Sequence, residues 1–261
     1  MQIASGADGK SRDIALTKQF LNSEGAFIVY DDAKVGQFNP QWFDPETWPD
    51  ADRTAGKAGG RGAVIFISPP ETPPAESQWV LRHYYRGGLP GKIIDDRFVW
   101  TGAEGTRSWR EWQLLVMIHA QGLPAPAPVA ARYVRHGLFY TADLITERLP
   151  DVLPLSTRLT TAPLPAALWQ SVGECIARFH DAGFFHADLN AHNLQIGSKD
   201  KLYLLDWDRG EHREPGGWAK NNLARLQRSL EKIKRQQGAH FEPADWANLE
   251  SGYAAAMSTH R

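Results

Sequence analysis

Three polar side chains in the second half of the chain have the types and spacing that phosphoryl transfer requires. Asp188 and Asn193 lie close together, and a second acid, Asp206, follows the apolar run 202–205. A carboxylate can orient an attacking hydroxyl and accept its proton, while an amide and a second carboxylate supply oxygen ligands that Mg²⁺ prefers. The spacing therefore predicts a catalytic loop at Asp188 and a strand that ends at a metal-binding Asp206.

A zinc site is the alternative interpretation of this region. His180, His186, Asp188 and His192 lie within thirteen positions. Their intervals match neither the H-E-x-x-H helix nor the short spacings of structural zinc sites. We therefore favour phosphoryl transfer and expect His186 to hold the loop through hydrogen bonds.

Phosphate binding requires a turn that lets backbone amides approach the anion. Gly59, Gly60 and Gly62 precede the apolar segment 63–68 and suit that role, because glycine has no side chain to keep the anion away. An ordinary hairpin turn is the alternative for these glycines.

A cation near the phosphates is the next requirement. Arg82 lies on the extended segment 78–84, and Glu111 on the following helix is its expected partner. Arginine can bind phosphate oxygens through two parallel hydrogen bonds. Two alternatives stay open: Ser108 and Glu111 can form a capping box, and Lys92 can be the cation.

Hydrophobic periodicity predicts more strands in the first half and more helices in the second. Strands are expected at 63–68, 78–84 and 140–149, with an extended segment at 124–134, and helices at 106–121, 169–182, 222–236 and 245–257. The first sixty residues look irregular. The pattern predicts an α+β fold with two lobes, a mainly β N-lobe over residues 1–149 and a mainly α C-lobe over 150–261.

Composition excludes several classes of protein. The net charge of −1 implies no general attraction to nucleic acid. Cys175 is the single cysteine, so an internal disulfide or a cysteine zinc site is excluded. No window approaches the roughly 20 apolar residues of a membrane-spanning helix, and the first residues lack the apolar core of a signal peptide. We expect a soluble, cytoplasmic protein with at most surface attachment to a membrane.

Several words of the sequence resemble the Kdo kinase branch of the lipopolysaccharide kinase family, which has a protein-kinase-like fold. They are LRHYYRGG at 81–88, TRS at 106–108, GLP at 122–124, PVAAR at 128–132 and DLNAHN at 188–193. The resemblance extends from about residue 59 to residue 218, and the RHYYRGG and DLNAHN words are specific.

The resemblance implies ATP-dependent phosphorylation of the 4-hydroxyl of 3-deoxy-D-manno-octulosonic acid (Kdo) on lipid A. The acceptor would be Kdo-lipid A, and the enzyme would act at the cytoplasmic face of a Gram-negative inner membrane. The resemblance assigns the catalytic base to Asp188. The wider kinase pattern implies that Asn193 and Asp206 bind Mg²⁺ and that Arg82, steadied by Glu111, binds the phosphates of ATP.

Two further features bear on nucleotide binding. Adenine is expected to meet the backbone near Glu147 and Leu149. Trp207 and Asp208 stand where the kinase Asp-Phe-Gly triplet has phenylalanine and glycine. Trp207 keeps an aromatic ring, whereas Asp208 argues against a switch that swings the ring in and out.

Other functions stay open from the sequence. The acceptor can be another small molecule of the heptose or aminoglycoside type, or the chain can be a nucleotide-binding pseudokinase scaffold. A protein kinase is less favoured, because no A-P-E word follows Asp206 in the remaining 55 residues. The cations of helix 222–236 can contact an anionic membrane surface. Neither a nucleic acid nor an obligate protein partner is expected.

Overall fold

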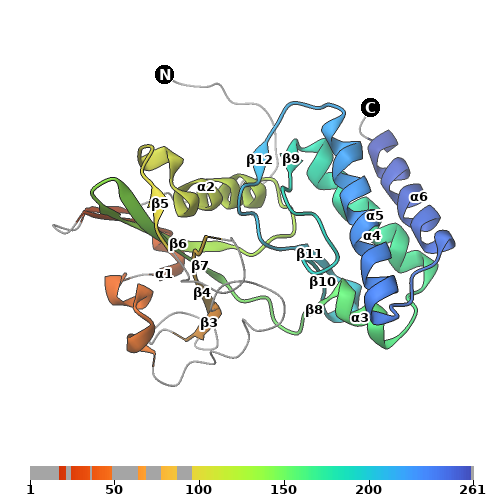
Figure 1. The fold of residues 1–261 in the computed structure, drawn as a ribbon, viewed down its shortest axis with the longest axis horizontal. Coiled ribbons are helices and arrows are strands. Elements are labelled where there is room, and N and C mark those ends of the chain that lie inside the picture. Colours follow the sequence, from red (N-terminus) through yellow and green to blue (C-terminus); the bar gives the residue numbers. More distant parts are fainter. Residues whose placement is uncertain are drawn as a thin grey trace.

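A seven-stranded antiparallel sheet forms one side of the protein, and a group of helices forms the other (Figure 1). The computed structural model describes residues 18–21, 25–35, 37–48, 64–68, 78–86 and 96–259. The sheet runs in the order β1-β2-β6-β7-β4-β3, and β5 pairs with β7. Its strands are β1 Lys18–Leu21, β2 Ala26–Tyr30, β3 Val64–Ile67, β4 Trp79–His83, β5 Phe98–Val99, β6 Pro128–His136 and β7 Phe139–Glu147.

The alternation of side chains along β4 gives the sheet two different faces. Trp79 and Leu81 are buried on the outer face with Trp42 and Phe43, which belong to the 3₁₀ helix η1 Pro40–Phe43. The short elements α1 Asp32–Val35 and η2 Pro45–Thr47 lie in the same part of the chain. Arg82 falls on the inner face, because its neighbours in sequence occupy the outer one.

Helix α2, Arg107–Ala120, packs on the inner face against β6 and β7. It follows the 3₁₀ helix η4 Ala103–Gly105. The side chains of Trp112, Leu115 and Ile118, which belong to this helix, are buried. The helix ends before Gly122, whose φ of +64° is the left-handed conformation that glycine adopts without strain.

Helices and two small sheets make up the other part. Strand β10 pairs with β8 and β11, and β12 pairs with β9. Helices α4 and α6 lie against each other (Figure 1). The elements are β8 Leu153–Pro154, α3 Leu155–Thr161, α4 Ala166–Asp181, β9 Phe184–Phe185, β10 Leu194–Ile196, η5 Ser198–Asp200, β11 Leu202–Leu204, β12 Glu211–His212, α5 Trp218–Gln237 and α6 Pro243–Thr259.

The contact between α4 and α6 depends on glycines at which the two backbones meet. A Cβ atom on Gly173 would lie 2.0 Å from the carbonyl oxygen of Leu249, and one on Gly252 would lie 2.1 Å from that of Gln170. Any larger residue at either position must therefore push the helices apart.

We expect Gly173→Ala to destabilise the protein by at least the roughly 1–3 kcal/mol typical of overpacked cores. Urea unfolding measures this loss as a lower midpoint with an unchanged slope. Gly217→Ala is the matched control, because nothing lies within 4 Å of the added Cβ and the φ of −64° suits alanine. Equal midpoints for the two variants would contradict the close contact of α4 and α6.

Most predicted elements are present, with shifted ends. The hairpin of β3 and β4, helix α2, strand β7, the last helix and the strand before Asp206 are confirmed. Helices α4 and α5 begin three and four residues earlier than expected. The irregular character predicted for the first sixty residues is wrong at 18–21 and 26–30, where β1 and β2 extend the large sheet beside β6. Helix α3 was not predicted.

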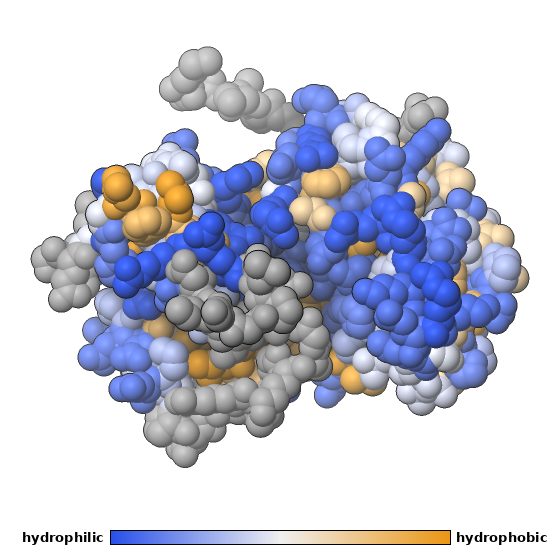
Figure 2. All heavy atoms as spheres, viewed as in Figure 1, coloured by the Kyte–Doolittle hydropathy of each residue, from blue (hydrophilic) through white to orange (hydrophobic). Residues whose placement is uncertain are grey.

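On the face drawn in Figure 2, the coloured surface between the two parts is mainly hydrophilic. Three of the exposed large apolar side chains, Val99, Leu138 and Phe139, gather at the β6–β7 turn, where β5 pairs with β7. Within the described residues, no helix combines the length and the apolar character that crossing a membrane needs.

Candidate active site

Asp188 lies on the loop before β10, and His186 fixes this loop through two hydrogen bonds. The buried imidazole of His186 accepts a hydrogen bond from the Asp188 N–H (3.1 Å) and donates one to the Leu205 carbonyl (2.8 Å). Burial lowers the pKa of His186, which suits a neutral ring with one donor and one acceptor nitrogen. His186 therefore ties the loop to the end of β11, as the sequence predicted.

Asn193 closes the same loop from its other end. Its side-chain Nδ2 donates to the Asp188 carbonyl over 2.9 Å, so its Oδ1 is the atom left to bind a metal ion. The Leu205 N–H donates to the Asn193 carbonyl over 2.9 Å. Asn193 is thus bonded both to the residue predicted as base and to the residue that precedes Asp206.

Asp206 stands directly after β11 in an unusual backbone conformation. Its φ is +63°, in the left-handed region, and its side chain is 44% exposed. Aspartate tolerates this conformation better than most residues, and non-glycine residues held there cluster at functional sites. This backbone conformation indicates a functional role for Asp206 independently of the sequence motif.

An ion-pair chain joins the sheet to this acid. The Arg82 guanidinium donates through Nη1 to Oδ1 of Asp206 (2.6 Å) and through Nη2 to Glu111 and to the Tyr84 hydroxyl (3.0 Å). The Tyr84 hydroxyl in turn donates to Glu111 over 2.5 Å. The pair of Arg82 and Glu111 predicted from the sequence is therefore present, and it reaches Asp206.

The capping-box alternative for Glu111 does not describe this structure. Ser108 donates to the Arg132 carbonyl (2.8 Å), and Glu111 bonds Arg82 and Tyr84 instead of the start of α2. The N-cap residue is Thr106, whose side chain makes no capping bond.

Burial dominates the ionisation of Glu111. Its side chain is 4% exposed, and this burial raises its pKa to about 7, although Arg82 and the Tyr84 hydroxyl act to lower it and Asp206 adds to the rise. A carboxylate held at such a cost to stability is a common feature of functional sites.

We expect the stability of the protein to carry the signature of this buried acid. The pKa of Glu111 is higher in the folded state than its ordinary value of 4.5, so the folded protein binds the extra proton between these two pH values. The free energy of unfolding contributed by Glu111 should therefore fall as the pH rises from 4.5 through 7, by up to about 3 kcal/mol. Urea unfolding of wild type and Glu111→Gln over this pH range measures the difference.

The control for this experiment is Glu174→Gln, at an exposed glutamate of α4. Its free energy of unfolding should follow that of the wild type at every pH. A difference between wild type and Glu111→Gln that stays constant from pH 4.5 to pH 8 would contradict the buried proton.

Asp188 has a cationic neighbour that the sequence did not suggest. Arg225 of α5 donates to Oδ1 of Asp188 through Nε (3.1 Å) and Nη2. Burial would raise the pKa of Asp188, but the bonds and charge of Arg225 outweigh it and the pKa is lowered. Asp188 is consequently ionised at neutral pH, while its side chain stays 42% exposed to a substrate.

The three histidines of the zinc alternative have separate hydrogen-bond partners. His180 contacts Tyr253 and Asn222, and His192 contacts Ser156. Within the described ranges, no three His, Cys, Asp or Glu side chains are grouped so that they could hold a metal ion. The side-chain oxygens of Asn193 and Asp206 are ligands of the hard type that Mg²⁺ prefers, and water and phosphate oxygens could complete its coordination.

The structure describes only some of the residues predicted to contact the nucleotide. Gly59, Gly60, Gly62 and the alternative cation Lys92 lie outside the described residues. The N–H of Glu147 donates to the Ala127 carbonyl over 2.8 Å, so this N–H is not free to meet an adenine base.

Leu149 is the other residue that is expected to meet adenine. The N–H of Arg148 donates to the Gln78 carbonyl, whereas no backbone bond engages the N–H of Leu149 within the described part of the chain. The contact of Leu149 with adenine stays a prediction.

Sequence reasoning missed two partners in the site. Tyr84 follows Arg82 by two residues, so the two-residue period of a strand places both on one face and could have revealed it. Arg225 lies 37 residues from Asp188 on a helix, and no local pattern indicated that contact.

Taken together, a loop aspartate beside an amide, and a strand-end aspartate joined to an arginine–glutamate pair, form the arrangement of protein-kinase-like phosphotransferases. The model of the Lipopolysaccharide kinase (Kdo/WaaP) family matches residues 46–253. The chain belongs to this family.

Relatives of known name agree with the family match. A 3-deoxy-D-manno-octulosonic acid kinase of Vibrio parahaemolyticus is 39% identical over 85% of this chain and 91% of its own length. Proteins of the same name from Actinobacillus succinogenes and Stenotrophomonas maltophilia (strain K279a) are 38% and 40% identical, over 89% and 88% of this chain and 98% and 90% of their own lengths. Among solved structures, WbdD with the kinase inhibitor LY294002 gives a TM-score of 0.41 at 16% identity, over 70% of this chain and 43% of that chain.

Proposed function

We propose that this protein is an ATP-dependent kinase that phosphorylates the 4-hydroxyl of Kdo on Kdo-lipid A during synthesis of the lipopolysaccharide inner core. The observation that carries the proposal is the ionised, half-exposed Asp188 on a loop bonded to Asn193 and to the end of β11. The names of the relatives support Kdo as the acceptor sugar.

The proposed mechanism assigns a role to each charged group. Asp188 accepts a hydrogen bond from the acceptor hydroxyl and takes its proton as transfer proceeds. Asn193 and Asp206 would hold Mg²⁺, which neutralises charge on the phosphates of ATP. Arg82 binds phosphate oxygens, and Glu111 with Tyr84 fixes its guanidinium in place.

The proposed nucleotide position lies between a mainly β N-lobe, residues 1–149, and a mainly α C-lobe, residues 150–261. Adenine would meet the backbone of the connecting segment near Leu149. The glycines 59, 60 and 62 would cover the phosphates.

An anionic acceptor suits the cations around Asp188. Kdo is a sugar acid, and Arg225 beside Asp188 is 48% exposed. Exposed Arg228, Lys232 and Arg235 continue along α5. We infer that this face of α5 meets the anionic glycolipid and the cytoplasmic surface of the inner membrane, where the protein would act as a peripheral enzyme.

Mass spectrometry of Kdo-lipid A after incubation with the protein, ATP and Mg²⁺ tests the proposal. We expect one added phosphate that requires all three components. Phosphate on a heptose or aminoglycoside acceptor alone would assign a different kinase, and no transfer to any acceptor despite ATP binding would indicate a pseudokinase.

Flotation with anionic liposomes tests the proposed location. The protein should float with them at low salt and detach as salt screens the charges. Absence of salt-sensitive binding would count against peripheral attachment through α5.

A further inference from the structure

Asp208 is the second acid after β11, and the proposed mechanism leaves it unused. Both of its carboxylate oxygens accept hydrogen bonds from Arg107, Oδ1 from Nε over 3.0 Å and Oδ2 from Nη2. The Asp208 side chain is only 18% exposed. A two-bonded arginine–carboxylate pair of this kind is directional as well as strong, and it occupies the oxygens that a metal ion would need.

Arg107 has further contacts that fix its position. It is the first residue of α2, and its backbone N–H donates to the Tyr140 hydroxyl over 3.1 Å. Its guanidinium carbon lies 4.8 Å from the centre of the Phe98 ring and 5.7 Å from that of Tyr84, within the range of cation–π attraction. The ion pair therefore connects a fixed point on the sheet side to the segment that follows Asp206.

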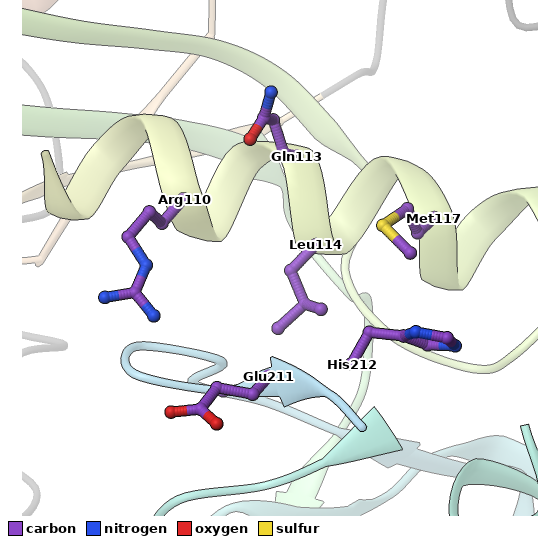
Figure 3. Close-up of a pocket in the computed structure, with 7 residues that line it drawn as sticks. Arg110, Gln113, Leu114, Met117, Glu211 and His212 are labelled. Atoms are coloured by element: carbon purple, nitrogen blue, oxygen red, sulfur yellow. The ribbon is translucent and has the colours of Figure 1, made fainter. Parts of the chain in front are cut away.

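The same helix and the same segment meet again further along. A Cβ atom on Gly210 would lie 2.7 Å from Cδ2 of Leu114, so the segment packs tightly under α2 there. Figure 3 shows Leu114 pointing from α2 toward the strand that carries Glu211 and His212. Beyond this contact an open pocket of about 390 Å³ separates the helix from β12.

Glu111 lies between these two contacts on α2. It follows Arg107 by four residues and precedes Leu114 by three, so the three positions share one side of the helix. The contacts at Arg107 and Leu114 thereby fix where Glu111 stands relative to Arg82 and Asp206.

We propose that Arg107 and Asp208 are positioning residues that hold α2 against the Asp206 segment, so that Glu111 keeps Arg82 directed at the phosphates of ATP. In many switchable enzymes an added phosphate supplies the anion that such an arginine binds. Here the chain encodes the anion as Asp208, so α2 is docked without modification. The inference rests on the proposed function, which assigns Arg82 to the nucleotide.

Four variants test the pair. Asp208→Asn removes the charge at constant shape, and Arg107→Lys keeps the charge but loses the planar two-bonded contact. The double variant Arg107→Asp with Asp208→Arg restores the pair in reverse. Arg110→Lys, at an exposed arginine one turn along α2, is the matched control.

Hydrogen exchange, nucleotide affinity and steady-state kinetics of these variants are compared with those of the wild type. Hydrogen exchange of the α2 amides should become faster in Asp208→Asn and Arg107→Lys. In the same variants the affinity for a non-hydrolysable ATP analogue, measured with Mg²⁺ present, should fall roughly tenfold, which is within the usual range of coupling between sites. The turnover number should fall with it while the KM for the acceptor stays constant. The reversed pair should recover the exchange rate, the affinity and the turnover number, and Arg110→Lys should match the wild type.

Unchanged exchange in α2 would overturn the inference, and so would faster exchange with unchanged nucleotide affinity and turnover, because that pattern describes a merely structural contact. Failure of the reversed pair to improve on the worse single variant would also overturn it. A wild-type protein that binds the nucleotide but leaves Kdo-lipid A unmodified would instead refute the proposed acceptor, since neither exchange nor nucleotide affinity involves the acceptor.

Discussion

Asp188→Asn is expected to lower the turnover number by about two to four orders of magnitude, the usual loss when a positioned base is removed. Asparagine keeps the shape of the side chain but cannot take the proton of the acceptor hydroxyl. The affinity for Mg²⁺-ATP should change little, because Asp206, Asn193 and Arg82 stay in place. Initial rates with Kdo-lipid A and calorimetric titration with the ATP analogue measure the two quantities.

Asp200→Asn is the control for this prediction. Asp200 is an exposed aspartate of the same part of the protein, and it also faces an arginine, Arg158, at 3.8 Å. Its replacement should leave both the rate and the affinity unchanged. A rate for Asp188→Asn within about twofold of the wild type would show that another group accepts the proton.

Much of this site could be predicted because its members are held by local structure. Asp188, Asn193 and the residue before Asp206 are joined by hydrogen bonds within one loop–strand–strand unit, so spacing alone could predict that they lie together. The pairing of Arg82 with Glu111 needs tertiary contact. It was predictable because a strand and the helix after it offer few cation–carboxylate choices.

The unpredicted parts depend on packing between distant segments. The contact of Arg225 with Asp188 and that of Arg107 with Asp208 span 37 and 101 residues, and no periodicity encodes them. Strand β2 was missed because it is buried on both faces, so it lacks the alternation that marks a half-exposed strand. Its pairing with β6 decides its conformation.

Asp206→Asn is expected to abolish the dependence of ATP binding on Mg²⁺. Asp206 is the charged member of the proposed ligand pair, so the affinity for Mg²⁺-ATP should fall by more than the 10- to 100-fold typical of a lost outer-shell partner. Without Mg²⁺ the effect of the substitution on ATP affinity should have the opposite sign. The wild-type carboxylate of Asp206 repels the bare triphosphate, whereas Arg82 attracts it in both proteins. The variant should then bind ATP at least as tightly as the wild type. Titrations with ATP analogue in Mg²⁺ and in chelator measure both affinities.

Weaker ATP binding with Mg²⁺, together with equal or tighter binding without it, distinguishes the loss of a metal ligand from the loss of structure. A misfolded variant would bind ATP more weakly under both conditions, whereas a missing ligand weakens binding only when Mg²⁺ is present. Asp181→Asn, at an exposed aspartate at the end of α4, should behave as the wild type in both titrations. If Asp206→Asn retained the full effect of Mg²⁺, the metal would have to be held elsewhere, and the left-handed conformation at Asp206 would then serve only its bond to Arg82.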